Sequence, residues 1–244
     1  MRVGRVIDTS PFGAAPLPTA PPKDPEVWAV RGLAGYAPVL DADEHRRAAA
    51  LRREADREIY VAAHTALRVV IGACLGEDPL AVRFTREDCP GCGGPHGRPA
   101  LAGTYGRHEA VGPQAHPESD VAPPLHFSLS HTHGLALIAL AATPVGVDVE
   151  ALPGARAVAD VAGTLHPDER GFLAQLPAEE RPFAFARCWT RKEAYLKGTG
   201  EGLGGGGFAR TVVGAAAHPL PLPGWTLTDV RVPDGYAAAI AVRD

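Results

Sequence analysis

The chain has 244 residues, of which 45% are hydrophobic, so it is long enough for one large domain or two smaller ones with a buried core. Its formal net charge of −4 argues against a protein that coats nucleic acid or a membrane surface, because both roles need a strong basic excess. The four cysteines are too few and too unevenly spaced for a disulfide scaffold of this size.

Residues 1–24 are rich in proline and are predicted to form a mobile, extended lead-in to the folded part. An acid and several prolines stand where a signal peptide would have an apolar core. Histidines interrupt the apolar stretch 121–147 before it reaches the roughly 18 residues of a membrane span. We therefore expect a cytoplasmic protein without a membrane partner.

The next segments predict a strand and a pair of helices. Residues 26–33 (EVWAVRGL) favour a short strand. Asp41 and Glu44 have the spacing of a capping box, which predicts a helix start. Apolar residues then recur at i, i+3 and i+4 from Ile59 to Val70, and Gly76 and Pro79 end this second helix. Residues 85–124, rich in Gly, Pro and His, predict a long excursion between strands.

The second half of the chain repeats this order. Residues 125–131 and 134–150 predict paired strands in the core of a sheet. Helices are expected at 167–176 and 178–197, the second with the acids of Pro-Ala-Glu-Glu (177–180) in its first turn. Weak strands follow near 208–213, 225–232 and 236–242. The order predicts an α+β fold of two similar halves in a pseudo-two-fold arrangement, residues 25–142 and 143–244, which meet near 142–146.

Three acidic residues predict a metal site. Asp148 and Glu150 are two residues apart on a strand, so both carboxylates leave the same face, about 6.6 Å apart along the chain. Trp189, Glu193 and Lys197 are spaced by four residues and share one stripe of a helix. An oxygen-only set of this kind suits Mg²⁺ held together with substrate phosphates. Taken singly, each motif also fits a solvated strand end or a surface ion pair.

Two other motifs invite a functional interpretation. Cys89-Pro-Gly-Cys92, with His96 nearby, resembles half a zinc knuckle, but no second C-x-x-C follows, so an exposed loop with two reduced thiols is favoured over a structural zinc. GTGEGLGGGG (198–207) resembles a phosphate-binding loop, but it follows a helix and lacks the Lys-Ser/Thr of a P-loop. This segment predicts a helix end and a flexible turn.

Four segments together resemble the ordered motifs of the 4'-phosphopantetheinyl transferases, specifically of the long, pseudo-dimeric Sfp-type. They are GRPAL (97–101), FSLSHTHG (127–134), GVDVE (146–150) and WTRKEAYLKGTGEGL (189–203). The sequence departs from the family pattern at Arg98, where lysine is more frequent, and at Ser128, where asparagine is frequent. Arginine keeps the charge but offers a planar fork of donors in place of a point charge.

The resemblance implies a holo-acyl-carrier-protein synthase type of enzyme. Such an enzyme transfers the 4'-phosphopantetheine arm of coenzyme A to a serine of an apo acyl, peptidyl or aryl carrier protein in fatty acid, polyketide or nonribosomal peptide biosynthesis, and releases adenosine 3',5'-bisphosphate. Carried over, Asp148, Glu150 and Glu193 bind Mg²⁺, or alternatively Mn²⁺. Asp148, Glu193 and Lys197 are then the catalytic residues, with Glu193 as the base for the serine and Lys197 beside the leaving phosphate.

The resemblance also implies that Ser130, His131, Arg98 and Lys197 contact coenzyme A phosphates. A separate inference concerns the upstream basic residues. If residues 44–68 form one continuous helix, one stripe holds five of them, namely Arg46, Arg53, Arg57, His64 and Arg68. Arg53 and Arg57 are the ones expected to bind the 3'-phosphate, whereas a plain solvated face is the alternative.

Two further readings of the same motifs stay open. One is a binder of coenzyme A or of a carrier protein that keeps the fold without catalysis, and the other is a metal-dependent phosphodiesterase. The intact set of Asp148, Glu150, Glu193 and Lys197 argues against the binder. We expect a monomer, because two halves of one chain can build the site. Phe172, Phe183 and Phe185 fit either a carrier-docking surface or the hydrophobic core, and the sequence does not separate these two roles.

Overall fold

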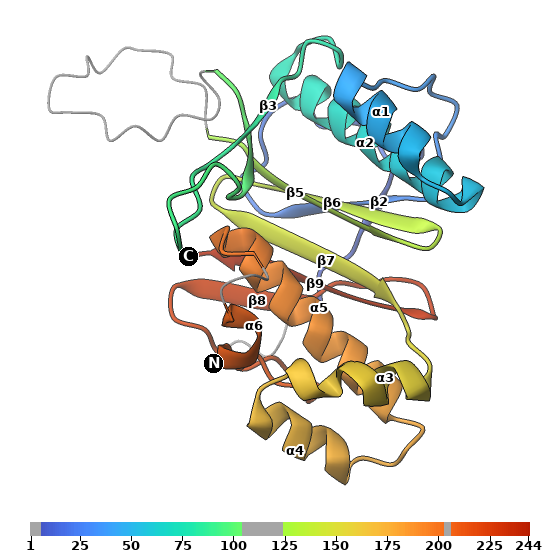
Figure 1. Ribbon diagram of the computed structural model, residues 1–244. Helices are drawn as coiled ribbons and strands as arrows, with labels where there is room; N and C mark the ends of the chain where they lie inside the picture. Colours follow the sequence, from blue (N-terminus) through green and yellow to red (C-terminus); the bar gives the residue numbers. More distant parts are fainter. Residues whose placement is uncertain (1–5, 104–123, 203–205) are drawn as a thin grey trace, which may run out of the picture.

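The computed structural model describes residues 6–103, 124–202 and 206–244, and its main body has four layers. Figure 1 shows helix α2 on top, then two sheets, then helix α5 below. The first sheet has the order β1-β2-β6-β5, and the second has the order β7-β9-β8. The strands of the first are β1 (Ser10–Pro11), β2 (Glu26–Val30), β5 (His126–Thr132) and β6 (Leu135–Ala141), and those of the second are β7 (Val145–Ala151), β8 (Trp225–Asp229) and β9 (Tyr236–Arg243). The mixed content confirms the α+β fold class.

Strand β6 shows why the middle of the protein is so apolar. Its residues alternate between two cores: Ala136, Ile138 and Leu140 pack toward α2, whereas Leu135 and Leu137 pack against the second sheet. A strand covered on both faces reads as a continuous apolar run. The run predicted as one strand over 134–150 is in fact two strands, because Thr143 and Pro144 break it and β7 joins the other sheet.

The chain thus passes from the first sheet to the second at residues 142–144, close to the predicted boundary between halves. A pseudo-two-fold relation between the two parts stays a prediction.

The helices of the first part are α1 (Ala42–Ala50) and α2 (Glu54–Leu75). Asp41 caps α1 by accepting hydrogen bonds from the amides of Asp43 and Glu44, and Glu44 accepts one from the Asp41 amide, which confirms the capping box. The premise of one continuous helix over 44–68 is wrong, since α1 ends before Leu51 and α2 begins at Glu54. The left-handed C-cap Gly76 (φ 66°) ends α2.

Helix α2 is also long and apolar enough to cross a membrane by length and composition alone. The expectation that no apolar run is long enough to span a membrane rested on residues 121–147 and did not account for α2. However, 72% of the apolar window of α2 is buried inside the protein, where it covers the first sheet. Core helices pass the same test, so the feature is explained by packing.

The lower part of the molecule carries most of the remaining helices. They are α3 (Ala155–Val161), a 3-10 turn (Ala162–Thr164), α4 (Pro167–Gln175), α5 (Arg181–Thr199) and α6 (Gly207–Arg210). Helix α3 was not predicted, and residues 207–210 form a short helix where a strand was expected. Helix α5 begins at Arg181, so Glu179 and Glu180 precede its first turn instead of lying in it.

The described part of the proline-rich lead-in differs from its prediction. Residues 6–24 are extended but packed: β1 runs parallel to β2, and the buried Phe12 stacks on Tyr36 with ring centroids 5.0 Å apart. Ile7 forms a bridge to Val230 beside the second sheet. This segment therefore touches both sheets, which proline content alone does not reveal.

A small hairpin interrupts the long excursion predicted for 85–124. Strands β3 (Phe84–Arg86) and β4 (Pro99–Leu101) pair antiparallel, and the loop between them holds both cysteines of the C-x-x-C motif. Part of the excursion, residues 104–123, lies outside the described residues, as do residues 203–205 of the glycine-rich segment.

Candidate functional site

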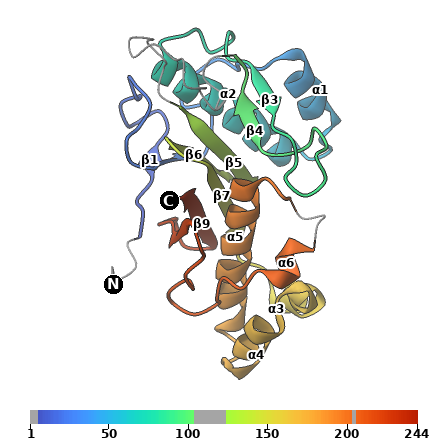
Figure 2. The ribbon, with the colours of Figure 1, turned by 90° about the vertical axis from the view of Figure 1, so that its left-hand side faces the viewer.

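The site lies where β7 meets α5, which Figures 1 and 2 both show side by side. Along β7, Val145, Val147 and Val149 face the core between the sheets, so strand alternation turns Gly146, Asp148 and Glu150 toward α5. Gly146 lets the two backbones approach, because a Cβ there would lie 2.0 Å from the Ala194 carbonyl oxygen and 2.4 Å from the Gly198 nitrogen. The close contact brings the two acids of β7 to the helix face that carries Glu193 and Lys197.

Asp148 is the centre of the polar contacts in this site. Its side chain is buried, and its Oδ1 accepts hydrogen bonds from Lys197 Nζ (2.6 Å) and Ser130 Oγ (2.8 Å). Lys197 Nζ also lies 3.0 Å from Ser130 Oγ. The other oxygen, Oδ2, is buried and has no hydrogen-bond partner among the described residues. A buried carboxylate oxygen without a partner is costly, and a cation would satisfy it.

The charge of Asp148 affects the pKa values of the other two carboxylates, Glu150 and Glu193. Burial raises the pKa of Glu150 to about 7, with a further increase from Asp148 and Glu193, although Lys197 acts in the opposite direction. Burial and then Asp148 also raise the pKa of Glu193. The oxygens of Asp148, Glu150 and Glu193 do not all lie within 4.8 Å of one another, so their side chains must rotate to hold one ion. The assignment of these three residues to a metal stays a prediction.

A series of hydroxyl groups joins β5 to β7. The Oγ of Ser128 accepts from the Val147 amide (3.0 Å), the Oγ of Ser130 from Val149 (3.3 Å), and the Oγ1 of Thr132 from Ala151 (3.4 Å). Side chains thus replace the usual backbone ladder between these strands of different sheets. The hydroxyl residues recur at every second position of Ser-Leu-Ser-His-Thr (128–132), which places them on one face of the strand. This spacing is the sequence signal for the contacts with β7.

Thr132 is a site residue that sequence analysis missed. Its hydroxyl donates to Glu150 Oε2 at 3.4 Å, so it orients this carboxylate.

His131 lies on the side of the site that faces α2. The Tyr60 ring stands edge-on to it, with centroids 6.1 Å apart, and Tyr60 stacks on His64 at 4.1 Å. Desolvation of the imidazole is the largest effect that lowers the pKa of His131, and the charges of the nearby His64 and Lys197 lower it further. The Tyr60 hydroxyl is buried and has no hydrogen-bond partner among the described residues. Tyr60 was not predicted as a site residue, since its position on the apolar stripe suggested only a core role.

Arg98 reaches the end of α5 from the loop before β4. Its Nη2 donates to both carboxylate oxygens of Glu87 (2.6 and 2.8 Å), and its Nη1 donates to the Gly198 carbonyl (3.2 Å). Its Nε is buried and has no partner among the described residues. The structure therefore places Arg98 one residue from Lys197 along the helix, with one donor left for a ligand.

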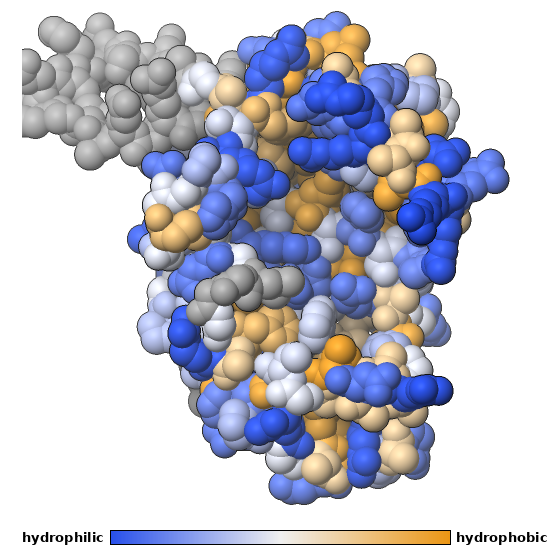
Figure 3. All heavy atoms as spheres, in the orientation of Figure 1, coloured by the Kyte–Doolittle hydropathy of each residue, from blue (hydrophilic) through white to orange (hydrophobic). Residues whose placement is uncertain are grey.

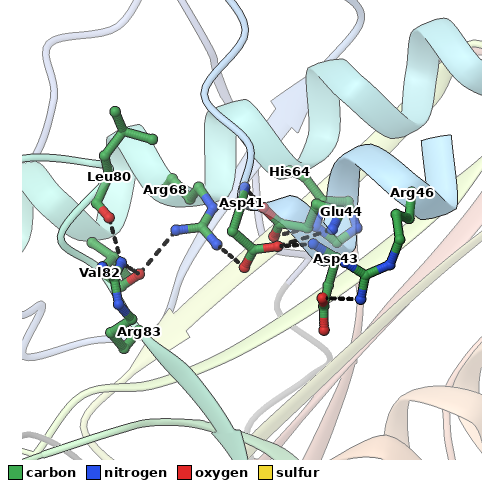
Figure 4. Close-up of polar contacts among 9 residues, drawn as sticks. All are labelled: Asp41, Asp43, Glu44, Arg46, His64, Arg68, Leu80, Val82 and Arg83. Atoms are coloured by element: carbon green, nitrogen blue, oxygen red, sulfur yellow. Dashed lines mark hydrogen bonds and ion pairs between the residues drawn. The ribbon is translucent and has the colours of Figure 1, made fainter. Parts of the chain in front are cut away.

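The basic residues of the predicted stripe do not share one role in the structure: some are buried in ion pairs and others lie on the surface. Figure 4 shows Arg68 inside the α1–α2 junction, where it donates to Glu44 Oε2 (2.7 Å), Asp41 Oδ2 (2.6 Å) and the Val82 carbonyl (2.9 Å). His64 Nδ1 lies 3.0 Å from Glu44 Oε1, and Arg46 pairs with Asp43 on the surface. Arg68 and His64 therefore stabilise the fold by these contacts.

Arg53 and Arg57 are exposed at the start of α2. Arg57 donates to the Leu51 carbonyl at 3.1 Å and lines a groove of about 510 Å³, together with Arg31 and Gly134 of the β5–β6 turn. Their role in binding a ligand stays a prediction.

Lys192, the first lysine of the W-x-x-K-E motif, is fully buried. Its Nζ lies 2.7 Å from Glu169 Oε2 and donates to the carbonyls of Phe208 (2.9 Å) and Thr211. Glu169 Oε1 in turn accepts from the amides of Val213 and Gly214. This pair ties α5 to α4 and α6 and does not face Asp148.

The phenylalanines considered for carrier docking separate into two groups. Phe185 is buried in the core around α5, whereas Phe172 and Phe183 are 36% and 46% exposed. A separate groove of about 280 Å³ lies between α3, α4 and the start of α5, and Val158, Ala162, Leu173 and Pro182 are among its lining residues. Figure 3 shows apolar side chains gathered on this lower face, over α3 to α5.

Comparisons with known proteins identify the family of this chain. A family model described as the 4'-phosphopantetheinyl transferase superfamily matches residues 144–230, which include Asp148, Glu150, Glu193 and Lys197. The chain is 31% identical to the 4'-phosphopantetheinyl transferase HetI of Nostoc sp., over 86% of this chain and 81% of the relative. It is 29% identical to a phosphopantetheinyl transferase of Thraustochytrium sp., over 76% of this chain and 64% of the relative. With a 4'-phosphopantetheinyl transferase of Bacillus pumilus it shares 37% identity, over 33% of this chain and 34% of the relative. The chain therefore belongs to the 4'-phosphopantetheinyl transferase family and is a transferase.

Proposed function

We propose that this enzyme transfers the 4'-phosphopantetheine arm of coenzyme A to a serine hydroxyl of an apo acyl, peptidyl or aryl carrier protein, in a Mg²⁺-dependent reaction that releases adenosine 3',5'-bisphosphate. The observation that carries the proposal is Asp148, a buried carboxylate with one oxygen paired to Lys197 and the other without a partner. Two more carboxylates with raised pKa values lie within reach of its charge.

The residues fit a hard divalent cation. Asp148, Glu150 and Glu193 offer only oxygen ligands, which Mg²⁺ prefers. Burial and then the charges of Asp148 and Glu193 raise the pKa of Glu150, and a bound cation would offset both effects. When bound, Mg²⁺ would neutralise negative charge on the pyrophosphate of coenzyme A. Mn²⁺ has the same ligand preference and is the alternative ion.

Glu193 is the proposed base for the incoming serine. The serine oxygen attacks the phosphorus that carries the pantetheine arm, and the bond from this phosphorus to the oxygen of adenosine 3',5'-bisphosphate breaks. The serine proton passes to Glu193, directly or through one water molecule. The raised pKa of Glu193 makes it a stronger base than an ordinary carboxylate, which suits proton transfer near neutral pH.

Lys197 is proposed to stabilise the leaving phosphate. Its side chain is 32% exposed while its ammonium pairs with Asp148, so we propose that a phosphate oxygen approaches it from solvent. As the phosphorus–oxygen bond breaks, negative charge grows on the leaving group, and a nearby ammonium lowers the energy of this state. Lys197 can also supply a proton to the leaving group.

The remaining phosphate contacts are proposed for Ser130, His131 and Arg98. Ser130 lies between Lys197 and Asp148, and Arg98 has one free buried donor. Arg53 and Arg57 are proposed to bind the 3'-phosphate from the exposed start of α2. Because β5, β7 and α5 of one chain supply the central residues, a monomer suffices for the reaction. A cytoplasmic location is part of the same proposal.

A mass measurement tests this function. The protein is incubated with coenzyme A, Mg²⁺ and a panel of apo carrier domains, and the carriers are weighed by mass spectrometry. We expect a gain of about 340 Da on at least one carrier, the mass of the transferred arm. Asp148→Ala and Glu193→Ala should abolish the gain and keep the fold, whereas Glu179→Gln, which alters an exposed acid before α5, should leave it unchanged. Near-normal turnover by both alanine variants would refute the assignment.

A further inference from the structure

The loop between β3 and β4 holds a group of side chains that the reaction does not use. The ligand atoms of Cys89, Cys92 and His96 all lie within 4.8 Å of one another, and Cys92 Sγ is 3.0 Å from His96 Nε2. Among the described residues, this is the one set of three His, Cys, Asp or Glu side chains drawn so closely together. The absence of a second C-x-x-C in the sequence favoured two reduced thiols over a zinc site, whereas the fold brings His96 of the same loop close to both cysteines.

The backbone of the loop is folded around the sulfur atoms. The Cys89 amide donates to the Gly94 carbonyl and the Gly93 amide donates to the Cys89 carbonyl, both at 2.7 Å. Gly93 has φ 71°, the left-handed region that favours glycine. These two backbone hydrogen bonds close the turn.

Backbone amides of the turn also contact the thiol of Cys89. The backbone amides of Gly91 and Cys92 hydrogen-bond to the sulfur of Cys89. Amide donors of this kind stabilise a thiolate, which is the form that binds metals. Gly94 leaves room for the other two ligands, because a Cβ there would lie 3.1 Å from His96 Nε2 and 3.4 Å from Cys92 Sγ.

We propose that Cys89, Cys92 and His96 bind one Zn²⁺ ion, at a site separate from the carboxylates around Asp148. Two thiolates and an imidazole are ligands that Zn²⁺ prefers, and the C-x2-C spacing is that of zinc knuckles. A water molecule takes the fourth position of the tetrahedron. The hard cation Mg²⁺ is a poor match for sulfur ligands, so the two sites select different metals.

The position of the loop gives the ion a structural role. Two backbone hydrogen bonds join the ends of the loop, from the Gly97 amide to the Glu87 carbonyl and from the Glu87 amide to the Arg98 carbonyl, both at 2.9 Å. The loop also touches the residue that ends α5, since a Cβ on Gly200 would lie 3.2 Å from the Arg98 nitrogen and 3.7 Å from Pro90. Zinc would thus fix the segment that carries Arg98 against the helix of Glu193 and Lys197.

Metal content tests the proposal on the full-length protein. Purified wild type is passed through a desalting column and its zinc is measured by inductively coupled plasma mass spectrometry. We expect one zinc per chain in the wild type and a loss of nearly all of it in Cys92→Ser and His96→Ala, whose side chains are exposed. His218→Ala, another exposed histidine, and Asp148→Ala should both keep the zinc. The second control separates this site from the carboxylates, so failure of the proposed function leaves this result unaffected.

A spectroscopic measurement identifies the ligands. Reconstitution with Co²⁺ should give a thiolate-to-metal charge-transfer absorption, together with the visible bands of a tetrahedral ion, and Cys92→Ser should lose the charge-transfer absorption. Circular dichroism of each variant checks that the fold is kept. Three results would overturn the proposal: a wild type that binds no zinc after loading with an equimolar amount, an intact Cys89–Cys92 disulfide in freshly purified protein, or folded variants that keep their zinc.

Discussion

The contact between Gly146 and α5 allows a quantitative test of how the fold sets the site. Gly146→Ala adds one methyl group, which would lie 2.0 Å from the Ala194 carbonyl oxygen and 2.4 Å from the Gly198 nitrogen. The first distance falls about 1.4 Å short of the 3.4 Å at which ordinary contacts begin. Gly146 does not have a positive φ, so the substitution tests the close approach and not backbone strain.

Both obstacles are backbone atoms of a helix, which cannot rotate away as a side chain can. Helix α5 must therefore move from β7 by about 1 Å or more. Overpacking of this kind costs about 1–3 kcal/mol, and we expect a loss near 3 kcal/mol in the free energy of unfolding. The shift also moves Glu193 and Lys197 relative to Asp148. Since a misplacement of about 1 Å can cost on the order of 100-fold in rate, transfer should fall by about that factor.

Urea unfolding measures the loss of stability, and mass spectrometry of the carrier product measures transfer. Gly171→Ala is the matched control, because Gly171 lies within α4 and has no atom within 4 Å of its added Cβ. Alanine is the better helix former, so this control should gain about 0.5–1 kcal/mol and keep its activity. If Gly146→Ala unfolds at the urea concentration of the wild type and retains its rate, the close contact does not position the site.

Three further predictions concern charge. Glu169→Gln leaves Lys192 buried without its counter-ion and should cost about 3–5 kcal/mol in urea unfolding; a loss below about 1 kcal/mol would contradict the pairing. Burial raises the pKa of Glu44, but hydrogen bonds from His64 and Arg68 outweigh it and hold the value at about 2, below the ordinary 4.5. The free energy of unfolding should therefore fall as the pH drops from about 4.5 to about 2, and Glu44→Gln should show a flatter profile over this window. Finally, burial raises the pKa of Glu150 to about 7, so its carboxylate, a proposed Mg²⁺ ligand, becomes protonated as the pH falls below 7. Mg²⁺ at a subsaturating concentration should therefore support less transfer below pH 7. An apparent Mg²⁺ affinity that does not change between pH 6 and 8 would contradict the role of Glu150 as a ligand.

Local patterns in the sequence predicted local structure well. The capping box of Asp41 and Glu44 and the apolar spacing from Ile59 to Val70 each depend on residues within one turn of a helix, so the chain specifies them directly. The placement of Asp148 and Glu150 on one face of a strand follows from strand geometry in the same way.

Partners far apart in the chain could not be predicted from such patterns. Lys192 and Arg68 both lie in motifs with visible basic residues, but their counter-ions Glu169, Glu44 and Asp41 are 23 to 27 residues away. Nothing local separates the buried Lys192 from the partly exposed Lys197 five residues on, because both are lysines of the same helical motif. Their different roles appear only when α4 and β7 are packed against α5.

Buried charged residues with a structural role differ from those of the candidate site in how many of their polar atoms have a hydrogen-bond partner. Arg68 and Lys192 are buried with carboxylates and carbonyl groups around them, so they need no ligand. The buried side-chain polar atoms without a partner in the described parts of the chain are Asp148 Oδ2, Arg98 Nε, the Tyr60 hydroxyl and Trp28 Nε1. Three of these four belong to residues beside β5 or the end of α5. A protein gains no stability from such unpaired groups, so their position beside β5 and the end of α5 is consistent with the ligand contacts proposed for Asp148 and Arg98.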